Sequence, residues 1–194
     1  MNAKTFCEMF TTEWKETESS ADFHNDLPFK DKPAWTSYML APNGFLHRVM
    51  RRLEKPSCPL FYKNEWYTVD ALYIGGCDLF RNDLMYPSSV KVLIEHEWGE
   101  SLEEEMWKLI HWRSPLKVII AYDWSEEEKK TEARRSWANK KLGKLKDMLQ
   151  IVNDSFGEIA ATEYLFLIAQ HNKPGAPIFW RAVKLTSTDL MEII

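Results

Sequence analysis

Three acidic side chains lie in two stretches that otherwise have the composition of buried strands. Asp70 interrupts the run YTVDALY at residues 67–73, and Glu95 and Glu97 follow VKVLI at residues 90–94. Asp is disfavoured inside strands. Alternate side chains of a strand point to opposite faces, so Glu95 and Glu97 project from the same side, about 7 Å apart. Two carboxylates so placed repel each other and lose solvation, so their presence in this strand requires an explanation.

A divalent cation is one such explanation. If the strands at 66–74 and 90–98 pair, Asp70 lies beside Glu95. The two side chains then offer hard oxygen ligands to Mg²⁺, which keeps several waters and needs few protein ligands. The alternative is that the acids face solvent at an exposed sheet edge, opposite Lys or Arg. His96 points to the other face of its strand, which indicates a structural histidine packed under a helix.

Hydrophobic periodicity gives the elements that must position these acids. Residues 17–41 are polar and contain prolines, which predicts a long surface excursion or an embellishment before the core. Ser101 and Glu104 form a capping box, and Asn43 is a fair helix N-cap. The predicted helices are 4–16, 43 to about 54, 101–112 and 125 to about 153; the predicted strands are 59–62 and 66–74 around a turn at 63–65, then 90–98, 116–122, 163–170 and 178–185.

This order predicts an α/β fold with a mixed central β-sheet flanked by helices, because short turns join some strands and helices join others. The 194 residues suit a single domain. The net charge of −4 argues against non-specific coating of nucleic acid. The three cysteines form no CxxC motif. The N-terminus lacks the apolar core of a signal peptide, and no apolar run approaches 18 residues. We therefore expect a cytoplasmic protein without a membrane segment.

The order helix, strand with Asp, strand with Glu-x-acid, helix, strand over about residues 42–123 resembles the PD-(D/E)XK restriction-endonuclease-like nuclease superfamily. Residues 94–98, IEHEW, are similar to the variant in which glutamate replaces the usual lysine. The match also includes the acid in the hairpin strand, the capped helix that follows, and the strand PLKVII at 115–120. The sequence departs from the family pattern at position 97, where the lysine that would stabilise phosphate charge is absent.

The resemblance implies a restriction-endonuclease-like fold and metal-assisted hydrolysis of DNA phosphodiesters. Asp70 and Glu95 would hold Mg²⁺, or Mn²⁺ in its place, and Glu97 or Lys108 would orient or deprotonate the attacking water. Lys108 has a second interpretation as a solvent-exposed i, i+4 partner of Glu104. Two further acids compete for roles. Asp78 is an alternative to Asp70, and Glu54 stands near the place of the family's extra N-terminal acid or is simply a surface residue.

A nuclease must also hold a polyanion, and one charged helix is rich in cations. Its candidate phosphate contacts are Lys129, Lys130, Arg134, Arg135, Lys140 and Lys141. The alternative is an ordinary solvated helix balanced by the glutamates at 126–128. The resemblance also allows a homodimer. A non-catalytic binding or regulatory protein on the same scaffold is the competing function, and an assembly or immunity protein with a Trp-rich surface is a third.

Overall fold

The computed structural model describes residues 1–20, 23, 31–76, 89–98, 101–123, 131–157, 162–170, 177–186 and 188–193 of the chain, with the backbone alone described at 123 and 131–137. The helices are α1 (Ala3–Glu18), α3 (Lys32–Leu40), α4 (Phe45–Leu53), α5 (Leu102–His111) and α6 (Thr131–Phe156). The strands are β1 (Leu60–Trp66), β2 (Val69–Gly75), β3 (Val90–Glu97), β4 (Leu116–Asp123), β5 (Glu163–Gln170), β6 (Phe179–Leu185) and β7 (Leu190–Glu192).

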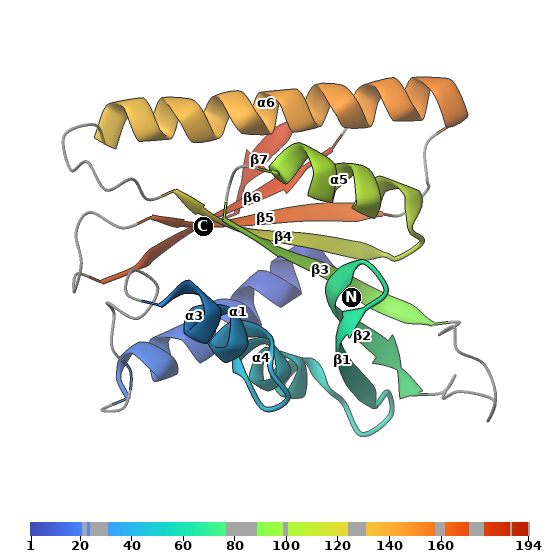
Figure 1. The fold of residues 1–194 in the computed structure, drawn as a ribbon. Coiled ribbons are helices and arrows are strands. Elements are labelled where there is room, and N and C mark those ends of the chain that lie inside the picture. Colours follow the sequence, from blue (N-terminus) through green and yellow to red (C-terminus); the bar gives the residue numbers. More distant parts are fainter. Residues whose placement is uncertain are drawn as a thin grey trace.

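The seven strands form one mixed sheet in the order β1-β2-β3-β4-β5-β6-β7. The pairs β3–β4 and β4–β5 are parallel, and the remaining pairs are antiparallel. The two parallel connections contain α5 and α6, as parallel strands require a crossover. Both of these helices cover one face of the sheet, while α1, α3 and α4 cover the other (Figure 1). The predicted α/β class with a mixed sheet is confirmed.

One hydrophobic core lies on each face of the sheet, and β3 contributes side chains to both cores. Val92 and Ile94 pack with the α1, α3 and α4 side chains, whereas Leu93 packs with α5 and α6. This is the alternation expected of a strand covered on both sides. The central strands β4 and β5 are almost wholly buried. For this reason their continuous apolar runs predicted the ends of both strands closely.

The β1–β2 hairpin turns later than the sequence indicated. The prediction of a turn at 63–65 is wrong, because β1 continues to Trp66 and pairs with Val69 around a loop of Tyr67 and Thr68. The backbone reverses through positive φ angles of 47° at Glu65 and 54° at Tyr67. Tyr67 is not a usual turn former, so the composition did not indicate a turn there.

Part of the polar segment at 17–41 forms a helix. Residues 32–40 form α3, and its Trp35, Met39 and Leu40 are buried. Asp31 caps this helix through the backbone N–H of Ala34, at 2.9 Å. Two predicted caps also differ: Gly44 rather than Asn43 is the N-cap of α4, and Ser101 caps α5 without a side-chain hydrogen bond.

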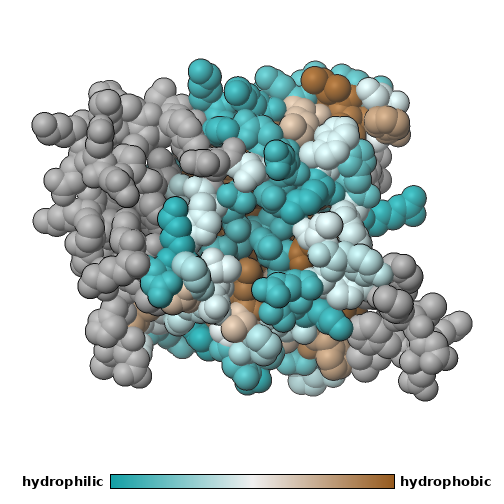
Figure 2. Space-filling view, viewed as in Figure 1, coloured by the Kyte–Doolittle hydropathy of each residue, from teal (hydrophilic) through white to brown (hydrophobic). Residues whose placement is uncertain are grey.

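The described surface is mostly hydrophilic on the face drawn in Figure 2. Hydrophobic atoms gather there over the C-terminal end of α6, where Ile151 and Phe156 are exposed. Among the described helices, none has both the length and the apolar composition needed to cross a membrane.

Candidate functional site

Asp70 and Glu95 face each other where β2 and β3 stop pairing. The last paired residues are Ala71 and Ile94. Beyond them, each carboxylate accepts a hydrogen bond from the backbone of the opposite strand. Asp70 N–H donates to Glu95 Oε2 at 3.3 Å, and His96 N–H donates to Asp70 Oδ2 at 2.7 Å. The two acids therefore lie together, as expected if these two strands pair, and the pairing is antiparallel.

Glu95 is the most unusual ionisable group of this site, because its side chain is 0% exposed. Burial raises its pKa to about 9, and the negative charges of Asp70 and Glu105 act in the same direction. The cation of Lys108 opposes them without cancelling them. A carboxyl group with this pKa is protonated at neutral pH unless a cation takes the place of its proton.

Lys108 reaches into the site from α5. Its Nζ lies 3.3 Å from Glu95 Oε1, forms an ion pair with Glu105 one turn earlier, and donates to the Thr68 carbonyl at 3.0 Å. These contacts tie α5 to both the acid and the β1–β2 hairpin. Within the described residues Lys108 forms ion pairs with Glu95 and Glu105 and none with Glu104, so the interpretation of Lys108 as a partner of Glu104 has no support.

Glu105 was not identified from the sequence, although its position three residues before Lys108 on a helix was a usable signal. A second lysine, Lys117, is buried on the same face of the sheet. Its Nζ donates to the Ile110 carbonyl at 3.3 Å and the Tyr164 hydroxyl at 3.1 Å, so it stabilises the C-terminal end of α5. Of these two lysines, Lys108 is the one in contact with the acids.

Asp70 and Glu95 could together supply two ligands to a cation. No hydrogen bond from the described residues reaches Glu95 Oε1, whose neighbour is the Lys108 ammonium. Glu97 is half-buried, and its carboxylate accepts a hydrogen bond from the Trp98 N–H at 2.7 Å. Within the described ranges, no three His, Cys, Asp or Glu side chains are arranged to hold one metal ion. Asp70 and Glu95 would thus supply the protein oxygens, and water the rest, which is a usual arrangement for Mg²⁺.

His96 anchors this end of β3 from the opposite face of the sheet. Its Nε2 lies 2.6 Å from the Tyr122 hydroxyl, which accepts a hydrogen bond from the Trp35 indole at 2.7 Å. The Tyr122 hydroxyl therefore links the Trp35 indole to the His96 ring. Burial lowers the pKa of His96 to about 3, so its imidazole is neutral. His96 is therefore a buried structural histidine, and its backbone N–H holds Asp70.

The remaining predicted acids are not brought to this pair by the described structure. Glu54 ends α4, and its Oε1 accepts a hydrogen bond from Leu60 N–H at 3.3 Å. Leu60 pairs with Gly75, at the other end of the hairpin from Asp70. Asp78 lies outside the described residues.

The cationic helix is described only in part. Lys129 and Lys130 lie outside the described residues, and only the backbone of Arg134 and Arg135 is placed, within α6. Lys140 is exposed. Lys141 instead contacts both oxygens of Glu103 on α5 at 2.8 Å. A cation engaged in this way is less available for phosphate than the sequence suggested.

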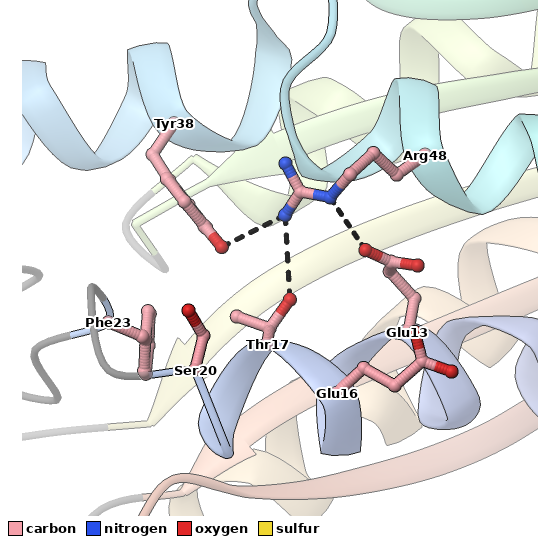
Figure 3. A pocket seen from close by; sticks show the side chains of 7 residues that line it. All are labelled: Glu13, Glu16, Thr17, Ser20, Phe23, Tyr38 and Arg48. Carbon is pink, nitrogen blue, oxygen red and sulfur yellow. Dashed lines mark hydrogen bonds and ion pairs between the residues drawn. The ribbon is translucent and has the colours of Figure 1, made fainter.

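A second polar constellation, which the sequence prediction missed, lies on the other side of the sheet (Figure 3). Arg48 of α4 donates to Glu13 of α1 at 2.6 Å, to Tyr38 of α3 at 3.0 Å and to Thr17 at 3.4 Å. Arg52 donates to the other oxygen of Glu13 at 2.6 Å. Glu13, Thr17, Tyr38 and Arg48 line a pocket of about 300 Å³. Together with Arg52 these groups bond to one another and form a clamp between α1 and α4.

The signal for this clamp was present in α1. Glu13 lies on the apolar stripe of Phe6, Phe10 and Trp14, so a helix there buries a carboxylate. A buried carboxylate requires cationic or hydrogen-bonding partners. Which arginines meet it depends on how α1 and α4 pack, which no local pattern gives.

Comparisons of this chain with protein-family models, with curated proteins and with solved structures found no match.

Proposed function

We propose that the protein is a Mg²⁺-dependent nuclease of the PD-(D/E)XK type that hydrolyses DNA phosphodiester bonds at Asp70 and Glu95. The observation that carries the proposal is the meeting of three groups: two carboxylates on adjacent strands and a lysine from the next helix, with Lys108 Nζ 3.3 Å from Glu95 Oε1. That lysine supplies from α5 the positive charge that is missing at Glu97.

The arrangement of the core supports the same proposal. The elements α4, β1, β2, β3, α5 and β4 follow one another as the resemblance implies, with β1 to β3 antiparallel and β4 parallel to β3. The helices α4 and α5 lie on opposite faces of the sheet (Figure 1). The acids stand near the ends of β2 and β3, just beyond the last paired residues, Ala71 and Ile94.

Each residue then has a defined task. Asp70 and Glu95 would hold the metal through their carboxylate groups, and the hydrogen bond from His96 N–H to Asp70 Oδ2 would orient the first of them. Lys108 would interact with the negative charge that develops on the phosphate, and Glu97 would orient the attacking water. A bound Mg²⁺ would polarise the phosphate and lower the pKa of a coordinated water.

The experiment that tests this function is calorimetric titration of Mg²⁺ and Mn²⁺ into the wild-type protein, Asp70→Asn and Glu95→Ala, with plasmid nicking measured on the same samples. Metal binding and nicking should both disappear in the two variants. Glu54→Gln is the matched control, because it alters a carboxylate on the same domain away from the site. Absence of metal binding by the wild-type protein would refute the proposal.

Lys108→Met should separate chemistry from metal binding. Nicking should fall by roughly 10²- to 10³-fold, because one charge-stabilising group is lost. Mn²⁺ affinity should be kept or increased, since the lysine no longer competes for Glu95. Glu104→Gln, on the exposed side of the same helix, should leave both quantities unchanged. Unchanged nicking in Lys108→Met would exclude this lysine from the reaction.

Metal affinity should also depend on pH. A cation must displace the proton of Glu95, whose pKa burial raises to about 9. The Kd for Mn²⁺ should therefore fall about tenfold for each pH unit between roughly pH 6 and pH 8.5. Titrations in two buffers of different ionisation enthalpy should report about one proton released per ion bound. A Kd that is independent of pH would mean that Glu95 gives up no proton when the ion binds.

A second candidate function is a non-catalytic DNA-binding or regulatory protein on the same scaffold. The ion pairs of Lys108 with both Glu95 and Glu105 favour it, because they form a closed network without a metal. DNA binding without metal binding or nicking would support this function over the nuclease.

A further inference from the structure

We infer that the loop of the β1–β2 hairpin stacks an unpaired base, so that the substrate is single-stranded DNA. The inference rests on the proposed function, because it names the substrate class of the same site. It is carried by Tyr67 and Trp66 at the hairpin loop, beside the acids and Lys108.

Tyr67 occupies a position that its backbone disfavours. It is the first residue of a two-residue hairpin loop and has a φ of 54°, a conformation for which Gly or Asn is preferred. The residue is also 52% exposed. A large aromatic residue therefore stands here in a left-handed conformation, about half open to solvent. Strain of this kind is retained where the residue has another use.

The ring of Tyr67 packs on a neighbouring aromatic side chain, which in turn packs on another. The Tyr67 ring meets Trp66 edge-on with centroids 4.5 Å apart, and Trp66 meets Trp112 at 6.1 Å. Trp66 and Trp112 are packed against the α5–α6 core. Tyr67 is thereby held in place while part of its ring remains open, which is the form of a stacking platform for bases.

The platform is joined directly to the candidate site. Thr68, the second loop residue, accepts the hydrogen bond from Lys108. Asp70 follows Tyr67 by three residues, which span at most about 10 Å. A phosphate held at Asp70, Glu95 and Lys108 would therefore have a neighbouring base within reach of the Tyr67 ring.

The local charge favours stacking over the phosphate contacts that a duplex requires. Three consecutive glutamates, Glu103 to Glu105, lie in the first turn of α5, the helix that carries Lys108. Two described lysines of α6, Lys141 and Lys144, lie 2.8 Å and 4.0 Å from Glu103. Duplex binding depends chiefly on cations that neutralise phosphates. Aromatic stacking requires a base that is not already paired.

Fluorescence anisotropy with labelled dT15 and with a 15-base-pair duplex, in EDTA at 50 mM salt, tests the inference. The wild-type protein should bind dT15 at least tenfold more tightly. Tyr67→Asn should weaken dT15 binding by roughly 5- to 150-fold, the effect of one stacked base. Its melting temperature should not fall, because Asn suits the left-handed loop. Tyr67→Phe should keep the affinity.

Phe61→Asn is the matched control, since it removes an exposed ring from β1 at the far end of the same hairpin. It should leave dT15 binding unchanged. Equal affinity for duplex and dT15, or unchanged binding by Tyr67→Asn, would overturn the inference. If that happens while metal binding and nicking still require Asp70 and Glu95, the nuclease proposal holds and only the stacking inference fails. Binding of dT15 through Tyr67 in a protein without metal binding would support the platform and refute the nuclease.

Discussion

Glu95→Gln should make the protein more stable at pH 8 while abolishing metal binding and nicking. In the folded state Glu95 keeps its proton up to a pH of about 9, whereas in the unfolded chain it releases it near its ordinary value of 4.5. The folded state therefore binds more protons between these limits, and the free energy of unfolding of the wild-type protein decreases as pH rises from 4.5 to 9.

Glutamine imitates the protonated carboxyl group and does not titrate, so the variant avoids this loss. At pH 8 the difference should be on the order of a few kcal/mol, and close to zero near pH 4.5. Thermal unfolding from pH 4.5 to 9 in EDTA measures it, with Glu104→Gln as the exposed control. A wild-type protein that is as stable as Glu95→Gln at pH 8 would show that Lys108 keeps Glu95 ionised, contrary to the direction of its pKa shift.

Glu13→Gln should cause the largest loss of stability. Its side chain is 8% exposed and accepts from two arginines, Arg48 and Arg52, at 2.6 Å each. Removing its charge leaves two guanidinium groups facing a neutral amide. Breaking a buried pair in this way costs about 3 kcal/mol, because the partners stay partly desolvated. The melting temperature should fall by about 10 °C in this size class.

Glu16→Gln is the control for this clamp. Glu16 also pairs with Arg52, yet its side chain is 63% exposed, so its loss should cost less than about 1 kcal/mol. Chemical denaturation of the three proteins gives both values. Equal stability of Glu13→Gln and the wild-type protein would mean that α1 and α4 are joined by their apolar contacts alone. DNA nicking should be unaffected at a temperature where the variant is folded, since the clamp and the acids lie on opposite faces of the sheet.

The sequence by itself determined the class of the fold and the pairing of the two acids. Strands buried on both faces need continuous apolar runs, so 116–122 and 163–170 were recognisable without knowledge of their neighbours. The same alternation that gives β3 two different faces separated Glu95 from His96. It also made a meeting of Glu95 with Asp70 predictable, given an antiparallel neighbour.

The tertiary structure decided which partners these groups meet. Whether Lys108 turns toward Glu104 or toward Glu95 depends on how α5 lies over the sheet, and Glu105 enters the site for the same reason. The helix α3 forms because Trp35 and Met39 are buried against distant elements, which overrides its polar flanks. The turn at Tyr67 likewise follows from the pairing of Trp66 with Val69. These outcomes depend on contacts between residues far apart in the chain, and local sequence patterns do not predict such contacts.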